Sequence, residues 1–469
     1  MLKALILARL LTPSDFGLFG IVMLALTTLD TFSQTGISAA LVQRRGDIRP
    51  FMGTAWTIQI VRGIVLAVLL YVAAPAVAAF FNEPAVTGLL RFVTLVLLAQ
   101  GLVSTGIVSF TRDLDFRRSF IFEVLSGGLS LAAGVILAYR LRSPWALVWA
   151  NLVGATARVV LSFLLSPIRP KLELKREQVG ELFAFGKWMS GYAMATWFWQ
   201  NIDRLVLGRM LGAGSLGVYQ MAQRIASMPV SEVAIASMGV SLPAYARIQN
   251  EKERLARSFL DTVEMTMSIV APLAAFLVLA APDVVQGLLG EQWVAAVVPL
   301  QILSIGALFT ALDAAATPLL VAVGKPKIEF WKNAVRSAAV GLIIVPLTAR
   351  YGLVGACLSF VIGSLAALAF WGYAVSAAAL GRRALAGRAL LVGAMAAPVC
   401  VAVSGARAAV PRPGAAGLAL VTAAAAISWL AAGYALRAWA NRGILVHIVR
   451  LKRAWAADET TNFGDGRSP

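Results

Sequence analysis

The sequence predicts an all-α polytopic membrane protein with about 14 transmembrane helices, arranged as two pseudo-symmetric six-helix lobes plus two C-terminal helices. Composition is the first reason: 59% of the residues are hydrophobic and only 14% are charged, whereas soluble domains carry about 25% charged residues. The second is that apolar runs of about 20 residues recur from Phe16 almost to Arg437. Each run can cross a hydrocarbon core of about 30 Å as a helix.

The third reason is an internal duplication with a shift of roughly 200 residues. Leu7–Phe19 aligns with Leu207–Tyr219 so that Leu, Arg, Leu and Gly positions coincide. Two further pairs keep nearly the same shift: Phe80–Pro84 with Leu288–Gln292, and Ala146–Val148 with Leu353–Gly355. An apolar repeat of this size is typical of one lobe of a two-lobed transporter.

Apolar length and the positions of charged connections define the individual segments. The predicted spans are 1–11, 17–42, 51–80, 86–110, 119–139, 145–166, 186–209, 215–244, 258–281, 294–322, 333–349, 352–379, 389–409 and 415–437. We expect an N-terminal lobe at 1–166, a cytoplasmic linker at 167–187, a C-terminal lobe at 188–380, two additional helices at 381–440 and a cytoplasmic tail at 441–469. The linker mixes apolar residues with charges, which favours an amphipathic stretch at the membrane surface.

The first segment departs from the repeat. Met1 aligns with Asn201, in the middle of the seventh segment. Eleven residues at about 1.5 Å each cover only about 16 Å, so we expect the first helix to be truncated, most simply because the true start lies upstream.

Basic residues are concentrated in alternate connections. The rich connections contain Arg44–Arg49, Arg112–Arg118, Arg169–Lys187, Arg247–Arg257, Lys325–Lys332 and Arg382–Arg388. Those around Thr12, Asn82, Gly212 and Gln286 carry few or no basic residues. By the positive-inside rule the rich connections and both termini are cytoplasmic. The net charge of +18 therefore reflects topology rather than nucleic-acid binding.

Several classes of chemistry lack support in the sequence. The chain has two cysteines, both inside apolar segments, and a single histidine in the basic tail, so we expect no metal site. No phosphate-binding G-x-x-x-x-G-K-[ST] motif occurs, and no loop is long enough for an active site. We expect no cofactor and no enzymatic activity.

Ionisable residues inside the predicted spans are the candidates for function. They are Arg62, Arg91, Arg158, Arg204, Arg224, Arg336, Asp30, Glu123, Asp203, Glu232, Asp261, Glu264 and Asp313. An arginine at a helix centre costs about 2.5–3.5 kcal/mol on insertion scales, so such residues face a wet cavity or partners. Arg62 and Arg224 lie nearest mid-span and favour a cavity role. Arg336 and Lys332 lie close to the cytoplasmic boundary and are expected to extend to the surface.

Two of these ionisable residues and two neighbouring amides allow two interpretations. Asp203 and Arg204 could neutralise partners on adjoining helices or bind a ligand. Asn201 and Gln220, with further amides and hydroxyls, suit a hydrated anionic and sugar-like cargo, although polar contacts between helices explain any one of them equally well.

The chain resembles the polysaccharide flippases of the multidrug/oligosaccharidyl-lipid/polysaccharide exporter superfamily, in the branch that handles O-antigen, capsule or exopolysaccharide units. The residues that carry the resemblance are Leu7–Gly17, Gly36–Arg44, Asn201–Arg204 with Leu207–Arg209, and Gly290–Trp293. The similarity covers about residues 1–380, and the truncated first helix is its main departure.

The resemblance implies an inner-membrane flippase that carries a polyprenyl-diphosphate-linked oligosaccharide across the bilayer by alternating access. The partners it implies are this lipid-linked oligosaccharide, the membrane and other polysaccharide-assembly proteins. Arg62 and Arg224, with Arg204 in reserve, would bind the diphosphate, while Gln220 and Asn201 would contact cargo. Asp30, Glu232, Glu264 and Asp313 are candidates for coupling to a proton or sodium gradient. The alternatives are a drug/cation antiporter of the same superfamily, a flippase for a lipid-linked peptidoglycan precursor, and a membrane glycosyltransferase or polymerase.

Overall fold

The computed structural model describes residues 2–33, 41, 47–166, 168–372, 382–409 and 414–440. Regular structure in these ranges is helical throughout. Most of the Gly36–Arg44 stretch and the whole of the tail 441–469 lie outside the described residues.

Eleven helices in the described part are long and apolar enough to cross a membrane. This confirms the all-α membrane class. Two of the eleven contain a break at a glycine, and the first helix, α1, has nine residues. The predicted count of about 14 stays a prediction.

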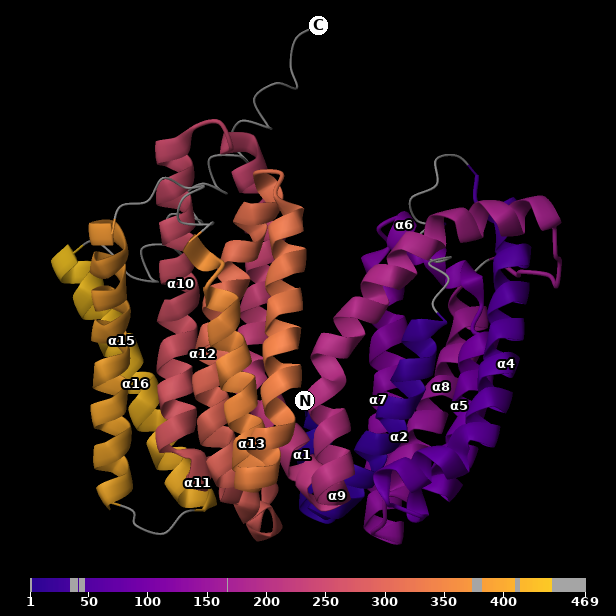
Figure 1. Ribbon diagram of the computed structural model, residues 1–469, viewed down its shortest axis with the longest axis horizontal. Helices are drawn as coiled ribbons and strands as arrows, with labels where there is room; N and C mark the ends of the chain where they lie inside the picture. Colours follow the sequence, from indigo (N-terminus) through magenta and orange to yellow (C-terminus); the bar gives the residue numbers. More distant parts are fainter. Residues whose placement is uncertain are drawn as a thin grey trace, which may run out of the picture. The chain divides into compact units, whose positions relative to one another are not determined.

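The chain divides into two compact units, Met1–Gln220 with Thr348–Leu353, and Met221–Leu347 with Val354–Pro469. The helices that begin in the first unit are α1 (Leu2–Leu10), α2 (Pro13–Phe32), α4 (Arg49–Phe81), α5 (Ala85–Leu102), η1 (Thr105–Ile107), α6 (Val108–Arg112), α7 (Phe116–Leu141), α8 (Trp145–Leu165) and α9 (Arg176–Ile248). Neighbours in sequence pack as pairs, α4 with α5 and α7 with α8 (Figure 1).

The second unit contains the end of α9 and then α10 (Lys252–Leu279), α11 (Ala281–Val284), the π-helix η2 (Val285–Leu289), η3 (Glu291–Ala296), α12 (Val297–Ala322), α13 (Pro326–Leu368), α15 (Arg382–Ala409) and α16 (Ala415–Ala440). Its core forms where α10 packs against α12, around Phe259, Val270 and Leu319. The additional helices dock on α10, where Trp429 Nε1 donates to the Ser268 carbonyl at 3.0 Å.

Glycines break the two longest helices where the sequence predicts a turn. Gly212 has φ 76° and ψ −179°, between the predicted segments 186–209 and 215–244. Gly352 has φ 57° within α13, next to the predicted boundary at 349–352. Residues that carry a side chain rarely adopt such positive φ values. Glycine therefore allows the backbone to break the helix at these two positions without strain.

The predicted linker, 167–187, is bonded to α4. Residues 168–175 have no regular structure, and α9 begins at Arg176, about ten residues before the predicted span. Glu173 N donates to Thr57 Oγ1 at 3.0 Å, Lys175 N donates to Thr54 Oγ1 at 3.3 Å, and Thr54 donates to the Gln178 side chain at 2.6 Å.

The two copies of the repeat begin their second helix differently. In the first copy Thr12 and Asp15 form a capping box, with Thr12 N donating to Asp15 Oδ2 at 2.9 Å. The aligned positions in the second copy are Gly212 and Ser215, which cannot form this box. Instead, Glu83 accepts from Ala213 N at 2.9 Å, so a carboxylate from the end of α4 satisfies the exposed helix N-terminus.

The same two segments cross each other within the first unit. A methyl group at Gly17 would overlap the Ala213 carbonyl, and one at Gly217 would overlap the Pro13 carbonyl. Because Gly17 aligns with Gly217 and Pro13 with Ala213, the contact is reciprocal, as expected around a local two-fold axis. Backbone approaches backbone directly at this crossing.

Candidate cargo and ion-coupling residues

Arg62 is bound to the C-terminal end of α2. Its Nη2 donates to Asp30 Oδ1 at 2.5 Å and to the Asp30 carbonyl at 2.8 Å, while Nε donates to Ser33 Oγ at 3.0 Å. The side chains of Arg62 and Asp30 remain 24% and 38% exposed. The structure therefore joins a predicted cargo residue to a predicted coupling residue.

The position of Arg62 in α4 agrees with a mid-span arginine. It lies 13 residues after Arg49, which is about 20 Å along the helix axis. Ser33 also donates to the Leu29 and Asp30 carbonyls at 2.6 and 3.0 Å, so the guanidinium lies beside main-chain carbonyls at the C-terminal end of α2. A cation is stabilised at such a helix C-terminus.

Asn201 and Arg204 are bonded to each other on α9. Arg204 Nη1 donates to Asn201 Oδ1 at 3.1 Å, and Asn201 Nδ2 donates to the Trp197 carbonyl at 3.0 Å. Beyond the break, Tyr219 donates to Asp203 Oδ2 at 2.6 Å. Asn201 and Asp203 are buried, so in this structure these groups hold α9 together.

Gln220 fills the space that Gly20 leaves. A methyl at Gly20 would collide with the Gln220 amide, and the two positions are aligned in the repeat. The Gln220 side chain thus packs on α2, one turn from the reciprocal glycine contact.

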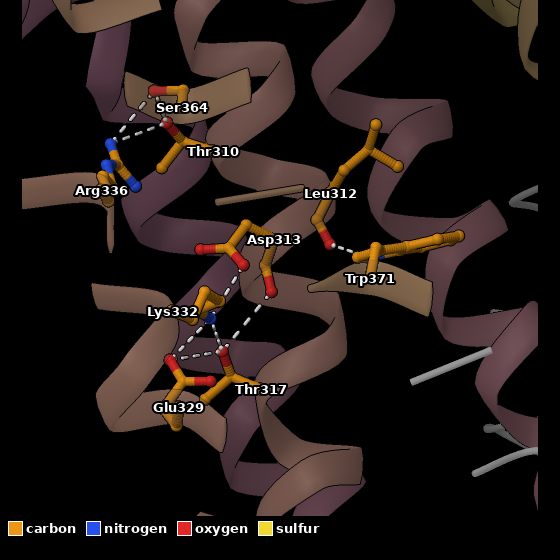
Figure 2. A network of polar contacts seen from close by, with 9 residues as sticks. All are labelled: Thr310, Leu312, Asp313, Thr317, Glu329, Lys332, Arg336, Ser364 and Trp371. Carbon is orange, nitrogen blue, oxygen red and sulfur yellow. Dashed lines mark hydrogen bonds and ion pairs between the residues drawn. The ribbon is translucent and has the colours of Figure 1, made fainter. Parts of the chain in front are cut away.

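A buried polar network occupies the second unit (Figure 2). Lys332 Nζ lies 2.8 Å from Asp313 Oδ1, 2.7 Å from Glu329 Oε1 and 3.3 Å from Thr317 Oγ1. The Lys332 side chain is only 3% exposed and that of Asp313 only 10%. A fully desolvated ammonium requires such a complete set of acceptors.

Arg336 lies one turn beyond Lys332 on α13. Its Nη2 donates to Ser364 Oγ at 3.1 Å and to Thr310 Oγ1 at 3.4 Å, and the guanidinium lies 5.5 Å from the centre of the Phe360 ring. Figure 2 shows both cations pointing between α12 and α13. Trp371 Nε1 donates to the Leu312 carbonyl of α12 at 3.1 Å.

The remaining predicted residues lie on other stretches of the chain. Arg224 and Glu232 are exposed side chains on the part of α9 that belongs to the second unit, and Glu264 is buried on α10. In the first unit Arg158 pairs with Glu123 at 2.8 and 2.9 Å, and Arg91 lies 5.0 Å from the Tyr71 ring.

Comparison with known proteins decides the family. The model of the family described as "polysaccharide biosynthesis protein" matches residues 6–298, more than half of the chain. The chain belongs to this polysaccharide biosynthesis protein family.

Curated relatives are distant in sequence. The chain is 25% identical over 334 residues to the succinoglycan biosynthesis transport protein ExoT of Rhizobium meliloti, covering 71% of this chain and 68% of that protein. It is 24% identical over 366 residues to the lipopolysaccharide biosynthesis protein WzxC of Escherichia coli, covering 77% and 74%. The teichuronic acid biosynthesis protein TuaB of Bacillus subtilis is 26% identical over 298 residues, covering 63% and 62%.

Solved structures agree on the fold of this polysaccharide biosynthesis protein. A lipid II flippase MurJ in an inward closed conformation superposes with a TM-score of 0.75 at 13% identity, covering 94% of this chain and 98% of that one. An inward-facing multidrug resistance MATE transporter of the MOP superfamily superposes with a TM-score of 0.65 at 18% identity, covering 81% and 94%. The predicted resemblance to exporter-superfamily flippases is confirmed.

Two sequence predictions for this family member are wrong. Lys332 and Arg336 were expected to extend to the cytoplasmic surface, but each residue is only 2% exposed. They are paired within the protein because Asp313, Thr317, Thr310 and Ser364 supply acceptors from α12 and α13.

Sequence reasoning also missed two participants. Glu329 completes the Lys332 network, and Ser33 positions Arg62. The spacing of Glu329 and Lys332, three residues apart in a helix, could have indicated their pairing. No pattern in the sequence links Ser33 to Arg62, which are 29 residues apart.

Proposed function

We propose that this protein is a flippase that moves a polyprenyl-diphosphate-linked oligosaccharide across the cytoplasmic membrane for polysaccharide synthesis. The family assignment and the names of its relatives support a role in polysaccharide assembly. The MurJ-like fold suits a lipid-linked cargo. The protein would act by alternating access, without enzymatic chemistry, and both termini would face the cytoplasm.

The depth of Arg62 in its helix and its partial exposure are the observation that carries this proposal. A guanidinium about 20 Å into an apolar helix, still 24% exposed, is costly unless it has a use. Its Nη1 donates no hydrogen bond among the described residues. The guanidinium is planar, and its Nη1 donors could bind phosphate oxygens together with Nη2 in a bidentate manner.

Arg224 in the second repeat is the other arginine proposed to bind the cargo diphosphate, with Arg204 in reserve. Asn201 and Gln220 would contact the glycan after a change of conformation frees their amides. Drug/cation antiport is less well supported, because exposed arginines disfavour a cationic cargo. A lipid-linked peptidoglycan precursor shares the diphosphate and remains the second candidate, favoured by the MurJ-like fold.

The test is complementation in a bacterial strain that lacks its own polysaccharide flippase. Arg62→Ala and Arg224→Ala should abolish surface polysaccharide at normal protein levels, with partial recovery by Arg→Lys. Loss of one charged hydrogen bond costs about 1.5–3 kcal/mol, or roughly tenfold or more in affinity. Normal export by both well-expressed Ala variants would show that these arginines are structural.

A further inference from the structure

The pairing of Asp30 with Arg62 raises the question of how cargo gains access to the guanidinium. Arginine stays protonated at all physiological pH values, so only the carboxylate can change the charge of this pair. The ionised Asp30 neutralises Arg62 and occupies Nη2 at 2.5 Å. A phosphate that binds the Nη1–Nη2 edge in a bidentate manner needs the same nitrogen.

The remaining contacts of Arg62 do not depend on the charge of Asp30. Nη2 also donates to the Asp30 main-chain carbonyl, and Nε donates to Ser33. If Asp30 takes up a proton, these two bonds still orient the guanidinium. Its positive charge then has no ionised partner among the contacts described.

Charged groups on the elements packed around the pair have contacts of their own. On α5, Arg91 lies over the Tyr71 ring of α4. On α9, which reaches the end of α2 where Trp197 and Phe198 contact Phe32, Asp203 and Arg204 bond to Tyr219 and Asn201. Asp30 is therefore the acid that faces Arg62 in the described part of the first unit.

We propose that Asp30 and the anionic cargo compete for Arg62, so that protonation of Asp30 releases the guanidinium to the cargo diphosphate. Proton binding and cargo binding then favour each other, and by linkage each raises the affinity for the other by the same factor. Exposure of both side chains, 38% and 24%, admits a proton and an anion. This inference rests on the proposed function, since it takes Arg62 as a diphosphate site.

The experiment uses the full chain, purified in lipid nanodiscs, with farnesyl diphosphate as the probe and farnesol as the uncharged control. Equilibrium binding is measured from pH 5.5 to 8.5. Asp30→Asn keeps an oxygen acceptor for Arg62 but removes the charge. At pH 8.5 this variant should bind the probe about 5- to 150-fold more tightly than the natural protein, the usual range of coupling.

The control variant is Asp47→Asn, an exposed acid near the start of α4 that accepts from Arg49 N at 3.0 Å. It should follow the natural protein at every pH. The charge of the diphosphate probe itself changes with pH. Comparing variants at the same pH cancels this contribution to the measured affinity.

The experiment distinguishes a failure of the proposed function from a failure of the proposed competition for Arg62. If Arg62→Ala binds the probe normally, the proposed function is wrong. If Arg62→Ala loses binding but Asp30→Asn binds no more tightly than the natural protein at pH 8.5, the competition is wrong and the diphosphate site stands.

A second measurement needs no variant, in case Asp30→Asn does not fold. Calorimetry of probe binding in two buffers of different ionisation enthalpy reports the protons exchanged on binding, and titration of the probe without protein gives the probe's own protonation. Net uptake of up to one proton supports the proposal. Zero exchange or net release at every pH overturns it.

Discussion

Arg62, inside a predicted span, and Lys332, at the boundary of one, differ in the completeness of their contacts. Lys332 is 3% exposed and has two carboxylates and a hydroxyl around one ammonium. Arg62 is 24% exposed and has one carboxylate, with Nη1 outside the described hydrogen bonds. Complete burial with complete pairing indicates a structural role, whereas partial exposure with spare donors indicates a binding role.

The Lys332 network yields a stability prediction. Lys332→Met leaves the buried Asp313 and the partly exposed Glu329 without their cation, and breaking a buried pair in this way typically costs about 3–5 kcal/mol. We expect a large loss of monodisperse protein in detergent and a lower melting temperature. The triple variant Lys332→Met/Asp313→Asn/Glu329→Gln removes all three charges and should recover most of the loss.

Lys327→Met on the same helix is the matched control, since Lys327 is exposed. It should melt like the natural protein. A Lys332→Met protein as stable as the Lys327→Met protein would show that the network contributes nothing to folding.

At the scale of elements, the two copies of the repeat meet through small residues and satisfy their helix ends by different means. Thr12 and Asp15 cap α2 from within its own sequence, whereas the helix after Gly212 takes its cap from Glu83, in the turn that follows α4. This difference ties the end of α4 to α9. The glycine crossing beside it leaves no room for a side chain.

The crossing predicts opposite effects for chemically identical substitutions. Gly17→Ala and Gly217→Ala place a methyl against a main-chain carbonyl, and overpacking of this kind typically costs about 1–3 kcal/mol. Gly128→Ala on α7 meets nothing within 4 Å and should be neutral or stabilise the helix by about 0.5–1 kcal/mol. Thermal unfolding in detergent, with each variant measured beside the natural protein, checks all three. Equal melting temperatures would contradict the close crossing.

At the scale of the whole molecule, charge asymmetry between connections fixes the expected orientation. Lys252 and Lys327 lie in basic connections that should face the cytoplasm, and Gln292 lies in the connection around Gln286, which has no Lys or Arg. All three side chains are exposed in the structure. Orientation in the membrane can therefore be probed at these positions without disturbing a core.

Single cysteines test the orientation in a background that lacks Cys357 and Cys400. Gln292→Cys should react with a membrane-impermeant maleimide in intact cells, whereas Lys252→Cys and Lys327→Cys should react only after the membrane is opened. The contrast follows from the positive-inside rule. Equal labelling of Gln292→Cys and Lys252→Cys in intact cells would reverse or refute the predicted topology.

The sequence by itself determined the membrane class, the helical breaks near Gly212 and Gly352, and the duplication, because these depend on local hydrophobicity, backbone conformation and spacing along the chain. It also singled out Arg62, Asp30 and Asp313 as charges in an apolar setting. Only the tertiary structure decided which charges are paired. Arg62 meets Asp30 across 32 residues, and Lys332 is withdrawn from the surface by Asp313. Such pairing depends on how helices pack side by side, and the cost of burying a charge is set by the partners that this packing supplies.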